Sequence, residues 1–452
     1  MPSDSAFDPQ DLLPTMRTYA SASRWWVGFS GGLDSTVLLH ALRTLRQQIP
    51  HWPEVEAVHI NHGLSLHANY WQEHCKTICA GWGIRLVCES VRVVPTGKGL
   101  EAAARKARLQ ALQQLLGENE SLFFAHHRDD QAETFFLRLL RGSGTRGLAA
   151  IAPSRSLGKG TLVRPLLPFS REALRAYAED QHLSWIEDDS NSDTQFDRNW
   201  LRHDVLPILK QRRPNLSHIW ARTSEVLAEE NTLLRQVAED DLNRCGDAAA
   251  RLGRSVDWLK LRSLSLPRRH NLIRFWLDQQ GLAVPEFQHL QKLDRGLGED
   301  LEQFAVQWRG AELRRYGGAL FSLPVVTTAL AGQLRISLNG ETSNCEFQLP
   351  DGTALKFEAA TGGIAQQHLR QCRIEFRQGG ERCQPQDRRH SQTLKKLLQE
   401  YRLEPWLRDR VPIIVSDESP ARIIAVGDLW VCKGYNAADD EKGWRPRWCL
   451  PA

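Results

Sequence analysis

The sequence predicts an α/β N-terminal domain with a doubly wound parallel sheet, followed by a mainly helical domain and a small α+β domain. Short apolar runs alternate with helical patterns over the first two hundred residues. Strand signals almost vanish over residues 206–300 and return from about residue 305. A chain of 452 residues also exceeds what one hydrophobic core usually organises. We expect an N-terminal domain at 1–205, a helical domain at 206–325, a linker with small β elements at 326–370 and a C-terminal domain at 371–440.

The N-terminal elements follow in a regular order. Apolar runs predict strands, and amphipathic stretches between them predict helices. The expected strands are 24–30, 55–60, 85–94 and 121–127, and the expected helices are 36–45, 65–82, 101–116 and 129–140. Strands that alternate with helices of this length form a parallel sheet covered on both faces. Ligands of such sheets bind at the carboxyl ends of the strands.

The later elements are of a different kind. Long helical patterns cover 218–242 and 268–280, and 305–316 with 319–326 has the pattern of a hairpin. The C-terminal unit reads as a strand, a basic loop, a helix and three further short strands.

Composition excludes several classes of protein. Hydrophobic residues make up 41% of the chain and charged residues 25%, as in a globular protein. No apolar run is long enough to cross a bilayer and no export signal is visible, so we expect no membrane contact and a cytoplasmic location. The nine cysteines form no C-x-x-C pair, which argues against a disulfide framework. The net charge of +4 permits a polyanionic partner, and the oligomeric state is left open.

The first motif joins the first strand to its helix: Ser30, Gly31, Gly32, Leu33, Asp34, Ser35 and Thr36. Two glycines let the backbone approach an anion, and the free amides of the helix's first turn point at the same place. Asp34 would repel phosphate, so its expected task is to hold a Mg²⁺ ion that bridges phosphates. A plain glycine turn with a helix cap is the structural alternative.

This loop resembles that of the PP-loop ATP pyrophosphatase superfamily, over roughly residues 24–150. The resemblance implies cleavage of ATP between the α and β phosphates, transfer of AMP to the substrate and release of pyrophosphate. It does not choose among amidotransferases, NAD synthetases, tRNA thiolases and lysidine synthetases.

A second motif, His126 to Thr134, lies where another strand passes into a helix. Asp130 and Glu133 are three residues apart and share one helical face, with Asp129 and Gln131 turned away. Helix capping explains Asp129 comfortably. Two same-face carboxylates beside histidines at a ligand edge indicate more, because carboxylates can receive an ammonium group or a metal and histidine can move a proton.

Further segments resemble bacterial tRNA(Ile)-lysidine synthetases. AHHRDDQAETFFLRLLRGSGTRGL, EAAARKAR, HINHGL and WIEDDSNSDTQFDRNWLRHDVLP look like that family's nucleotide-site segments and signature. The segment from Gly379 to Tyr435 looks like its C-terminal tRNA-recognition domain. Residues of about 211–370 carry little that can be matched, although a tRNA-contacting helical domain is expected there.

The resemblance implies a specific reaction. The wobble cytidine of an isoleucine tRNA with a CAU anticodon would be adenylated at carbon 2 with ATP and Mg²⁺, and the amine of L-lysine would then displace AMP. Ser30 to Thr36 and His62 would hold the nucleotide, with Asp34 and Asp130 on the metal. Arg105 and His127 would stabilise phosphate charge, and Asp130 and Glu133 would position the lysine amine.

Basic residues at two places are the candidate RNA contacts. Arg388, Arg389, Lys395 and Lys396 lie around one amphipathic helix, for which a solvated surface is an equal alternative. Arg198, Asn199 and Arg202 are expected to face the anticodon stem. Salt bridges from these arginines to Asp188, Asp189, Asp193 or Asp204 are as natural an interpretation.

Three other functions compete with this one. A tRNA thiolase would typically need paired cysteines at short spacing, which the chain lacks. A non-catalytic tRNA-binding protein would not need an intact Ser30, Asp34 and Ser35. A small-molecule amide synthetase would not need the basic C-terminal unit.

Overall fold

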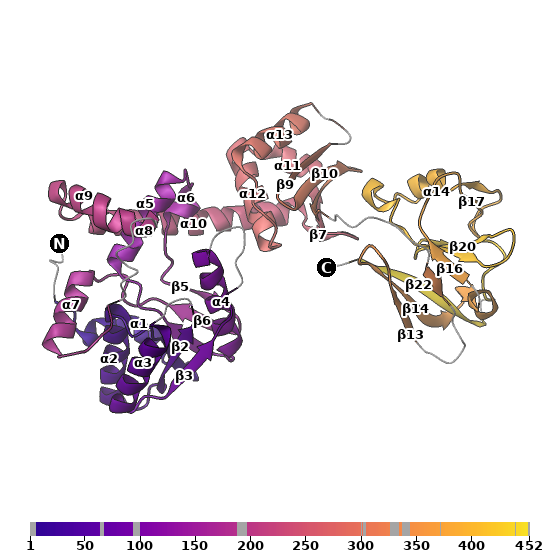
Figure 1. Ribbon diagram of the computed structural model, residues 1–452. Helices are drawn as coiled ribbons and strands as arrows, with labels where there is room; N and C mark the ends of the chain where they lie inside the picture. Colours follow the sequence, from indigo (N-terminus) through magenta and orange to yellow (C-terminus); the bar gives the residue numbers. More distant parts are fainter. Residues whose placement is uncertain are drawn as a thin grey trace. The chain divides into compact units, whose positions relative to one another are not determined.

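The computed structural model divides into two compact units, Met1–Leu233 and Leu234–Ala452 (Figure 1). The structure describes residues 6–63, 67–93, 100–187, 197–299, 301, 304–325, 334–336, 344–370, 372–438 and 440–450. None of the helices in these ranges has the length and apolar character needed to span a membrane.

The first unit is built on a six-stranded sheet with the order β3-β2-β1-β4-β6-β5. The strands are β1 (Arg24–Gly28), β2 (Val55–Asn61), β3 (Leu86–Ser90), β4 (Glu120–Phe123), β5 (Ser154–Leu157) and β6 (Gly160–Val163). Every neighbouring pair is parallel except β5 and β6, which form an antiparallel hairpin at one edge. The predicted doubly wound parallel sheet is confirmed. The sequence did not predict the edge hairpin, because β5 and β6 are too short to show a clear pattern of alternating apolar residues.

Helices cover both faces of this sheet. One face packs against the 3₁₀ turn η1 (Pro9–Leu12), α1 (Leu13–Thr18), α2 (Leu33–Gln48), α3 (Ala68–Trp82) and α7 (Arg171–Asp180), around a core that includes Trp25, Val27 and Phe123. The other face carries α4 (Leu100–Leu115), whose Leu112 packs with Trp26 and Leu122. Because β1 is buried on both faces, its sequence is almost uninterruptedly apolar.

The carboxyl edge of the sheet leads into a group of helices. They are α5 (Arg128–Leu140), α6 (Thr145–Leu148), α8 (Asp197–Trp200), the π-helical turn η3 (Leu201–Val205), α9 (Leu206–Arg212) and α10 (Leu216–Cys245). The rings of Phe136 on α5 and Trp220 on α10 stack with centroids 5.1 Å apart. Long-range packing of this kind fixes α5 against the start of α10.

The second unit begins with a mixed layer of helices and strands. Its helices are α11 (Trp258–Ser263), α12 (Leu266–Gln279) and α13 (Phe287–Gly298). The strands β7 (Ala248–Ala249), β8 (Arg254–Asp257), β9 (Ala305–Trp308), β10 (Ala311–Tyr316) and β11 (Ala319–Pro324) form a sheet with the order β7-β8-β11-β10-β9. The expected hairpin is therefore part of a larger sheet. The four residues of β8 are too few to show a period, and they become a strand by pairing with Ala319–Ser322.

The C-terminal part contains two main sheets and one described helix of regular α type, α14 (Leu394–Glu400). One sheet joins β12 (Leu334–Ile336), β16 (Cys372–Glu375), β19 (Ile413–Ser416), β20 (Ile423–Val426) and β21 (Trp430–Val431). The other joins β13 (Asn344–Gln348), β14 (Ala354–Thr361), β22 (Lys442–Cys449) and β15 (Ile364–Ala365). Two short strands, β17 (Arg382–Cys383) and β18 (Gln392–Thr393), pair with each other before α14. The 3₁₀ turn η4 (Gln366–Leu369) precedes β16, and the 3₁₀ turn η5 (Pro405–Leu407) follows α14.

The stretch expected as a linker contributes strands to the last sheet. Strand β14 pairs with β22 along its whole length, from Ala354 opposite Cys449 to Thr361 opposite Lys442. The pairing joins residues about ninety positions apart, so local sequence could not reveal it. The four predicted domain boundaries stay predictions.

Candidate active site

The loop between β1 and α2 has the conformation that the two glycines predict. Gly31 has φ +82°, a backbone state that L side chains rarely adopt, and a Cβ built there would lie 3.0 Å from Cys75 Sγ. Gly32 is the N-cap of α2. The Gly31 carbonyl accepts a hydrogen bond from the Ile186 amide at 2.9 Å, which anchors the bend from outside.

Three hydroxyl groups hold the loop from inside. Ser35 Oγ lies 3.0 Å from Ser30 Oγ and donates to the Gly32 carbonyl at 3.0 Å, and Thr36 Oγ1 donates to the same carbonyl at 2.9 Å. The first intrahelical bond of α2 runs from the Thr36 amide to Gly32. The amides of Leu33, Asp34 and Ser35 precede it, so α2 geometry gives them no partner inside the helix. They form an electropositive helix end that suits an anion.

Asp34 lies in the first turn of α2 and faces the start of α5. Its Oδ2 is 3.6 Å from His127 Nε2, and its Oδ1 is 4.0 Å from Arg171 Nε. Within the described ranges Oδ1 is buried and has no hydrogen-bond donor. Burial raises the pKa of Asp34 above its usual value, against the opposing charge of His127, and nearby Asp130 raises it further. The neighbouring cations therefore do not fully offset the cost of burying the negative charge of Asp34.

His127 and Asp130 adjoin Asp34 at the N-terminus of α5. The His127 amide donates to Asp130 Oδ2 at 3.0 Å, and His127 Nε2 is 3.5 Å from the same oxygen. The His127 side chain is only 2% exposed. Its ring therefore lies between two carboxylates, close to the loop that would receive phosphates.

Glu133 is held by two arginines. Its side chain is 1% exposed, and Arg202 donates to both of its oxygens, at 2.7 and 3.0 Å. Arg198 Nε donates to Glu133 at 2.7 Å, and Arg198 Nη2 donates to Asp130 Oδ1 at 2.8 Å. The negative charge of both carboxylates favours the charged guanidinium groups and raises the pKa of Arg198 and Arg202 despite their burial. Asp130, Glu133, Arg198 and Arg202 form one network.

Both arginines had been assigned to RNA on the sequence. In the structure they bind the carboxylates of α5, which neither of the two sequence interpretations contained. Asp188, Asp189 and Asp193, three of the alternative partners, lie outside the described residues. Asn199 sits half-buried between the two arginines in sequence, on α8.

Asp129 points to the other side of α5, as its helical position predicts. It accepts hydrogen bonds from Lys210 Nζ at 2.8 Å, from Ser217 Oγ at 3.0 Å and from the Arg171 amide at 3.0 Å. Burial alone would raise the pKa of Asp129, but the Lys210 ammonium and the Arg171 amide outweigh it and hold the pKa below the usual value. Asp129 thereby joins α5 to α7, α9 and α10. The sequence identified it only as a cap, because its partners lie more than forty residues away.

Two other predicted residues lie around this centre. His62 follows the end of β2 and is half-buried, next to the strand β1 that carries the loop. Arg105 is exposed on α4, and within the described part of the chain we find it in no hydrogen bond or ion pair with His127 or Asp130. Its charge acts instead on Arg108, Arg138 and Arg164.

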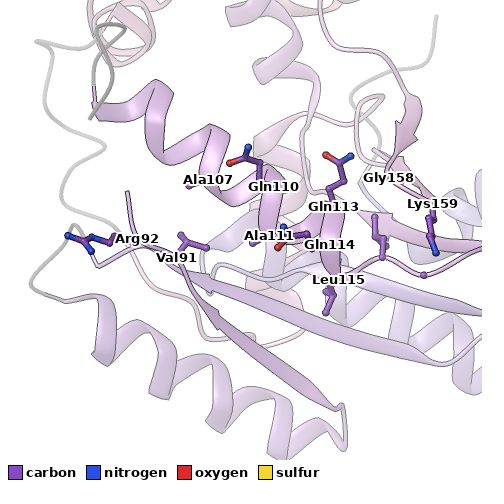
Figure 2. A pocket seen from close by; sticks show the side chains of 12 residues that line it. Val91, Arg92, Ala107, Gln110, Ala111, Gln113, Gln114, Leu115, Gly158 and Lys159 are labelled. Carbon is purple, nitrogen blue, oxygen red and sulfur yellow. The ribbon is translucent and has the colours of Figure 1, made fainter. Parts of the chain in front are cut away.

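A pocket of about 910 Å³ lies beside α4, lined among others by Arg92, Ala107, Ala111, Gln114 and Lys159 (Figure 2). None of the residues predicted for the site lines it. The candidate site is therefore the open carboxyl edge of the sheet and not this hollow.

Comparisons with known proteins match the whole chain. A PP-loop domain model matches residues 9–209, a TilS substrate binding domain model matches 259–321 and a TilS substrate C-terminal domain model matches 372–448. The tRNA(Ile)-lysidine synthase of Coxiella burnetii is 38% identical over 448 residues, covering 97% of this chain and 96% of that protein. The protein of that name from Serratia proteamaculans is 40% identical, covering 93% and 94%.

The chain belongs to the tRNA(Ile)-lysidine synthase family.

Membership of the tRNA(Ile)-lysidine synthase family confirms the resemblance found from the motifs, and the match at 259–321 covers part of the stretch in which the sequence alone showed no similarity. Family members are ATP-dependent PP-loop ligases, so a thiolase or a non-catalytic binding protein no longer competes.

The basic residues predicted to contact RNA in the second unit differ in their partners. Arg388 Nη2 is 3.0 Å from Glu400, and Lys396 Nζ is 3.8 Å from the same carboxylate. Arg389 and Lys395 are exposed and make no ion pair with any residue that the structure describes. In a tRNA(Ile)-lysidine synthase the unpaired cations are the better placed of the four to meet a phosphate.

Proposed function

We propose that this protein modifies the wobble cytidine of an isoleucine tRNA with a CAU anticodon to lysidine. ATP activates carbon 2 of the cytidine by adenylation, L-lysine supplies the amine that replaces AMP, and pyrophosphate is the other product. The single observation that carries the proposal is the convergence of the loop Ser30–Thr36 with the Asp34, His127 and Asp130 side chains at one sheet edge. The names of the relatives support the same reaction.

The loop is the expected seat of the pyrophosphate portion of ATP. The helix-end amides supply hydrogen-bond donors, and the hydroxyl groups of Ser30, Ser35 and Thr36 keep the bend in shape. His62, which directly follows β2, is proposed to contact the nucleoside. His127 and the guanidinium of Arg105 are the groups proposed to stabilise phosphate charge as it redistributes.

The residues present suit Mg²⁺. Asp34 Oδ1, which accepts no hydrogen bond within the described residues, and the nearby Asp130 offer carboxylate oxygens, and the raised pKa of Asp34 indicates that a cation would stabilise its charge. Among the described residues no three His, Cys, Asp or Glu side chains form a metal cluster, which agrees with an ion held by one or two carboxylates and substrate phosphates. When bound, Mg²⁺ would neutralise phosphate charge during transfer.

Lysine is proposed to bind at the α5 carboxylates. A protonated amine is no nucleophile, so a group at the site must accept a proton before attack. Asp130 and His127 lie within reach of each other and are the candidates. Glu133 is expected to act on lysine through the two guanidinium groups that it fixes beside Asp130.

The test is a single-turnover reaction with ATP, Mg²⁺, labelled lysine and a transcript of the isoleucine tRNA. We expect lysine in the RNA, one pyrophosphate for each lysine, and none with a methionine tRNA of the same anticodon. Pyrophosphate release that needs no RNA would point to a small-molecule synthetase. Failure to consume ATP would overturn the proposal.

A further inference from the structure

Five arginines gather on the α4 side of the first unit, and the proposed reaction explains only one of them. This arginine cluster comprises Arg105 and Arg108 on α4, Arg138 on α5, Arg155 on β5 and Arg164 just after β6. None of the five forms an ion pair with a carboxylate of the described chain. Some other arginines of the same unit are paired, as Arg24 is with Glu56 and Arg175 with Glu187.

Backbone carbonyls and one ring hold the cluster in place. Arg138 Nη1 donates to the carbonyls of Gly147 and Ala150 at 2.6 and 2.8 Å, and Arg164 Nη1 donates to Ala152 at 2.7 Å. The Arg108 guanidinium lies over the Phe124 ring, 5.5 Å from its centroid. Neutral partners position the guanidinium groups but leave their charge uncompensated.

The positive charges repel one another. Burial, followed by the charges of Arg155 and Arg105, lowers the pKa of Arg164 to about 10. Burial and the charge of Arg105 also lower the pKa of Arg138. The Arg164 side chain is 9% exposed, and its Nε has no hydrogen-bond acceptor in the described part of the chain. A site of this kind is complete only when an anion occupies it.

The cluster adjoins the reaction centre without belonging to the nucleotide loop. The Phe124 ring under the Arg108 guanidinium lies 5.7 Å from the His126 ring, centroid to centroid. Burial first, and then the charges of Arg164 and Arg108 in the cluster and of Arg198 outside it, lower the pKa of His126 to about 4, against the attraction of Asp130. His126 precedes His127 in the chain. The groups that act most on Asp34 are different: His127, Asp130, Arg171 and Arg202.

We propose that the arginine cluster binds backbone phosphates of the RNA strand next to the target cytidine. Guanidinium groups match phosphate oxygens with two parallel hydrogen bonds, and several groups on separate elements suit a chain of phosphates better than one small anion. The inference rests on the proposed function for its substrate, because the cluster itself requires only a phosphate backbone.

The experiment measures binding of the full-length protein to the isoleucine tRNA transcript over a series of KCl concentrations. Arg108→Gln/Arg155→Gln removes two cluster members that have no proposed role at the nucleotide. Arg108 makes no backbone hydrogen bond within the described residues, and Arg155 makes one, to the Ser156 carbonyl at 3.3 Å. The slope of log affinity against log salt is expected to fall by about two, since about one counterion is released for each phosphate contact. Protection of the protein from thermal unfolding by ATP and Mg²⁺ is expected to stay as in the wild type.

Two controls sharpen the result. Arg17→Gln/Arg43→Gln removes the same charge from α1 and α2, which pack on the opposite face of the sheet, and should leave the slope unchanged. Neither arginine forms an ion pair within the described residues. Arg108→Lys/Arg155→Lys keeps both charges and should largely keep the slope.

A cluster variant that binds tRNA as the control does would overturn the inference. So would a loss of ATP protection with unchanged tRNA binding, because the anion would then be the nucleotide. If the wild type binds tRNA through the cluster but incorporates no lysine, the proposed function fails and the RNA site stands.

Discussion

The Glu133 side chain is almost closed off from solvent, and two guanidinium groups donate hydrogen bonds to it. Three hydrogen bonds of 2.7 to 3.0 Å join it to Arg198 and Arg202. Removal of one member of a buried ion pair leaves its partners uncompensated and costs far more than the pair contributes net. The first consequence of changing Glu133 should therefore be structural.

Glu133→Gln is expected to lower the free energy of unfolding by roughly 3 kcal/mol and to reduce lysine transfer more than ATP binding. Urea unfolding followed by tryptophan fluorescence measures the first effect, and lysine incorporation with ATP protection measures the second. Glu179→Gln, on the exposed surface of α7, is the matched control. Full stability together with an unchanged dependence on lysine concentration would remove Glu133 from the site.

Asp34 presents the opposite case, because its charge is disfavoured in the absence of a ligand. An acid whose pKa is raised by folding loses stability as the pH rises above its ordinary value of 3.8. Asp34→Asn is therefore expected to leave the thermal midpoint at neutral pH equal or higher, while it abolishes Mg²⁺-dependent pyrophosphate release. A lower thermal midpoint together with normal pyrophosphate release would contradict both the proposed metal role of Asp34 and the destabilising effect of its buried charge.

His126 should contribute to acid instability. Folding lowers the pKa of His126 from 6.5 to about 4. Between pH 4 and pH 6.5 the imidazole is therefore protonated in the unfolded chain and neutral in the folded chain. Stability is complete above about pH 6.5 and falls by up to about 3 kcal/mol as the pH drops towards 4. His126→Gln is expected to flatten the urea-midpoint profile over this interval. The exposed His51→Gln should retain the wild-type profile.

At the scale of elements, the first helix-loop unit was predictable because its information is local. The glycines, the hydroxyl residues and Asp34 occupy six of the seven positions 30–36, and the structure gives each a contact or a backbone angle that its type suits. The arginine network was not predictable in the same way. Arg198 and Arg202 meet Glu133 across more than sixty residues, and a run of arginines and acids in one segment predicts local pairs equally well. The pairing of strand β14 with β22 also joins segments far apart in the sequence, so it was not predictable from local patterns either.

Two neighbouring glycines of the loop should respond differently to alanine. At Gly31 the positive φ and the Cys75 contact make a Cβ costly, by roughly 1–3 kcal/mol, so Gly31→Ala should lose stability and ATP binding together. At Gly32, φ is −79° and the nearest atom to a Cβ is 3.5 Å away, so Gly32→Ala should keep its fold. It should still weaken ATP binding if phosphates approach the backbone there. Calorimetric unfolding with and without ATP separates the two effects, and equal behaviour of both variants would contradict the proposed approach.

At the scale of the whole molecule, the described part of the site that would perform the chemistry lies within the first compact unit, and the second unit carries the exposed cations around α14. Isoleucine and methionine tRNAs with the same anticodon can be told apart only by contacts elsewhere on the RNA. The second unit is the expected source of such contacts. Charge changes in the second unit should then alter the affinity for tRNA and leave ATP binding unchanged.

The paired and unpaired cations around α14 make this expectation specific. Arg389→Gln/Lys395→Gln removes two exposed charges without a carboxylate partner in the described chain, and the salt slope of tRNA binding should fall by about two. Arg388→Gln/Lys396→Gln removes the same charge but frees Glu400 from both of its partners, so this variant gains an unpaired negative charge. It should weaken tRNA binding through repulsion while it changes the slope less. A wild-type slope in both variants would show that these residues make no phosphate contact in the complex. ATP protection should be normal in each variant, because the nucleotide loop is in the other unit.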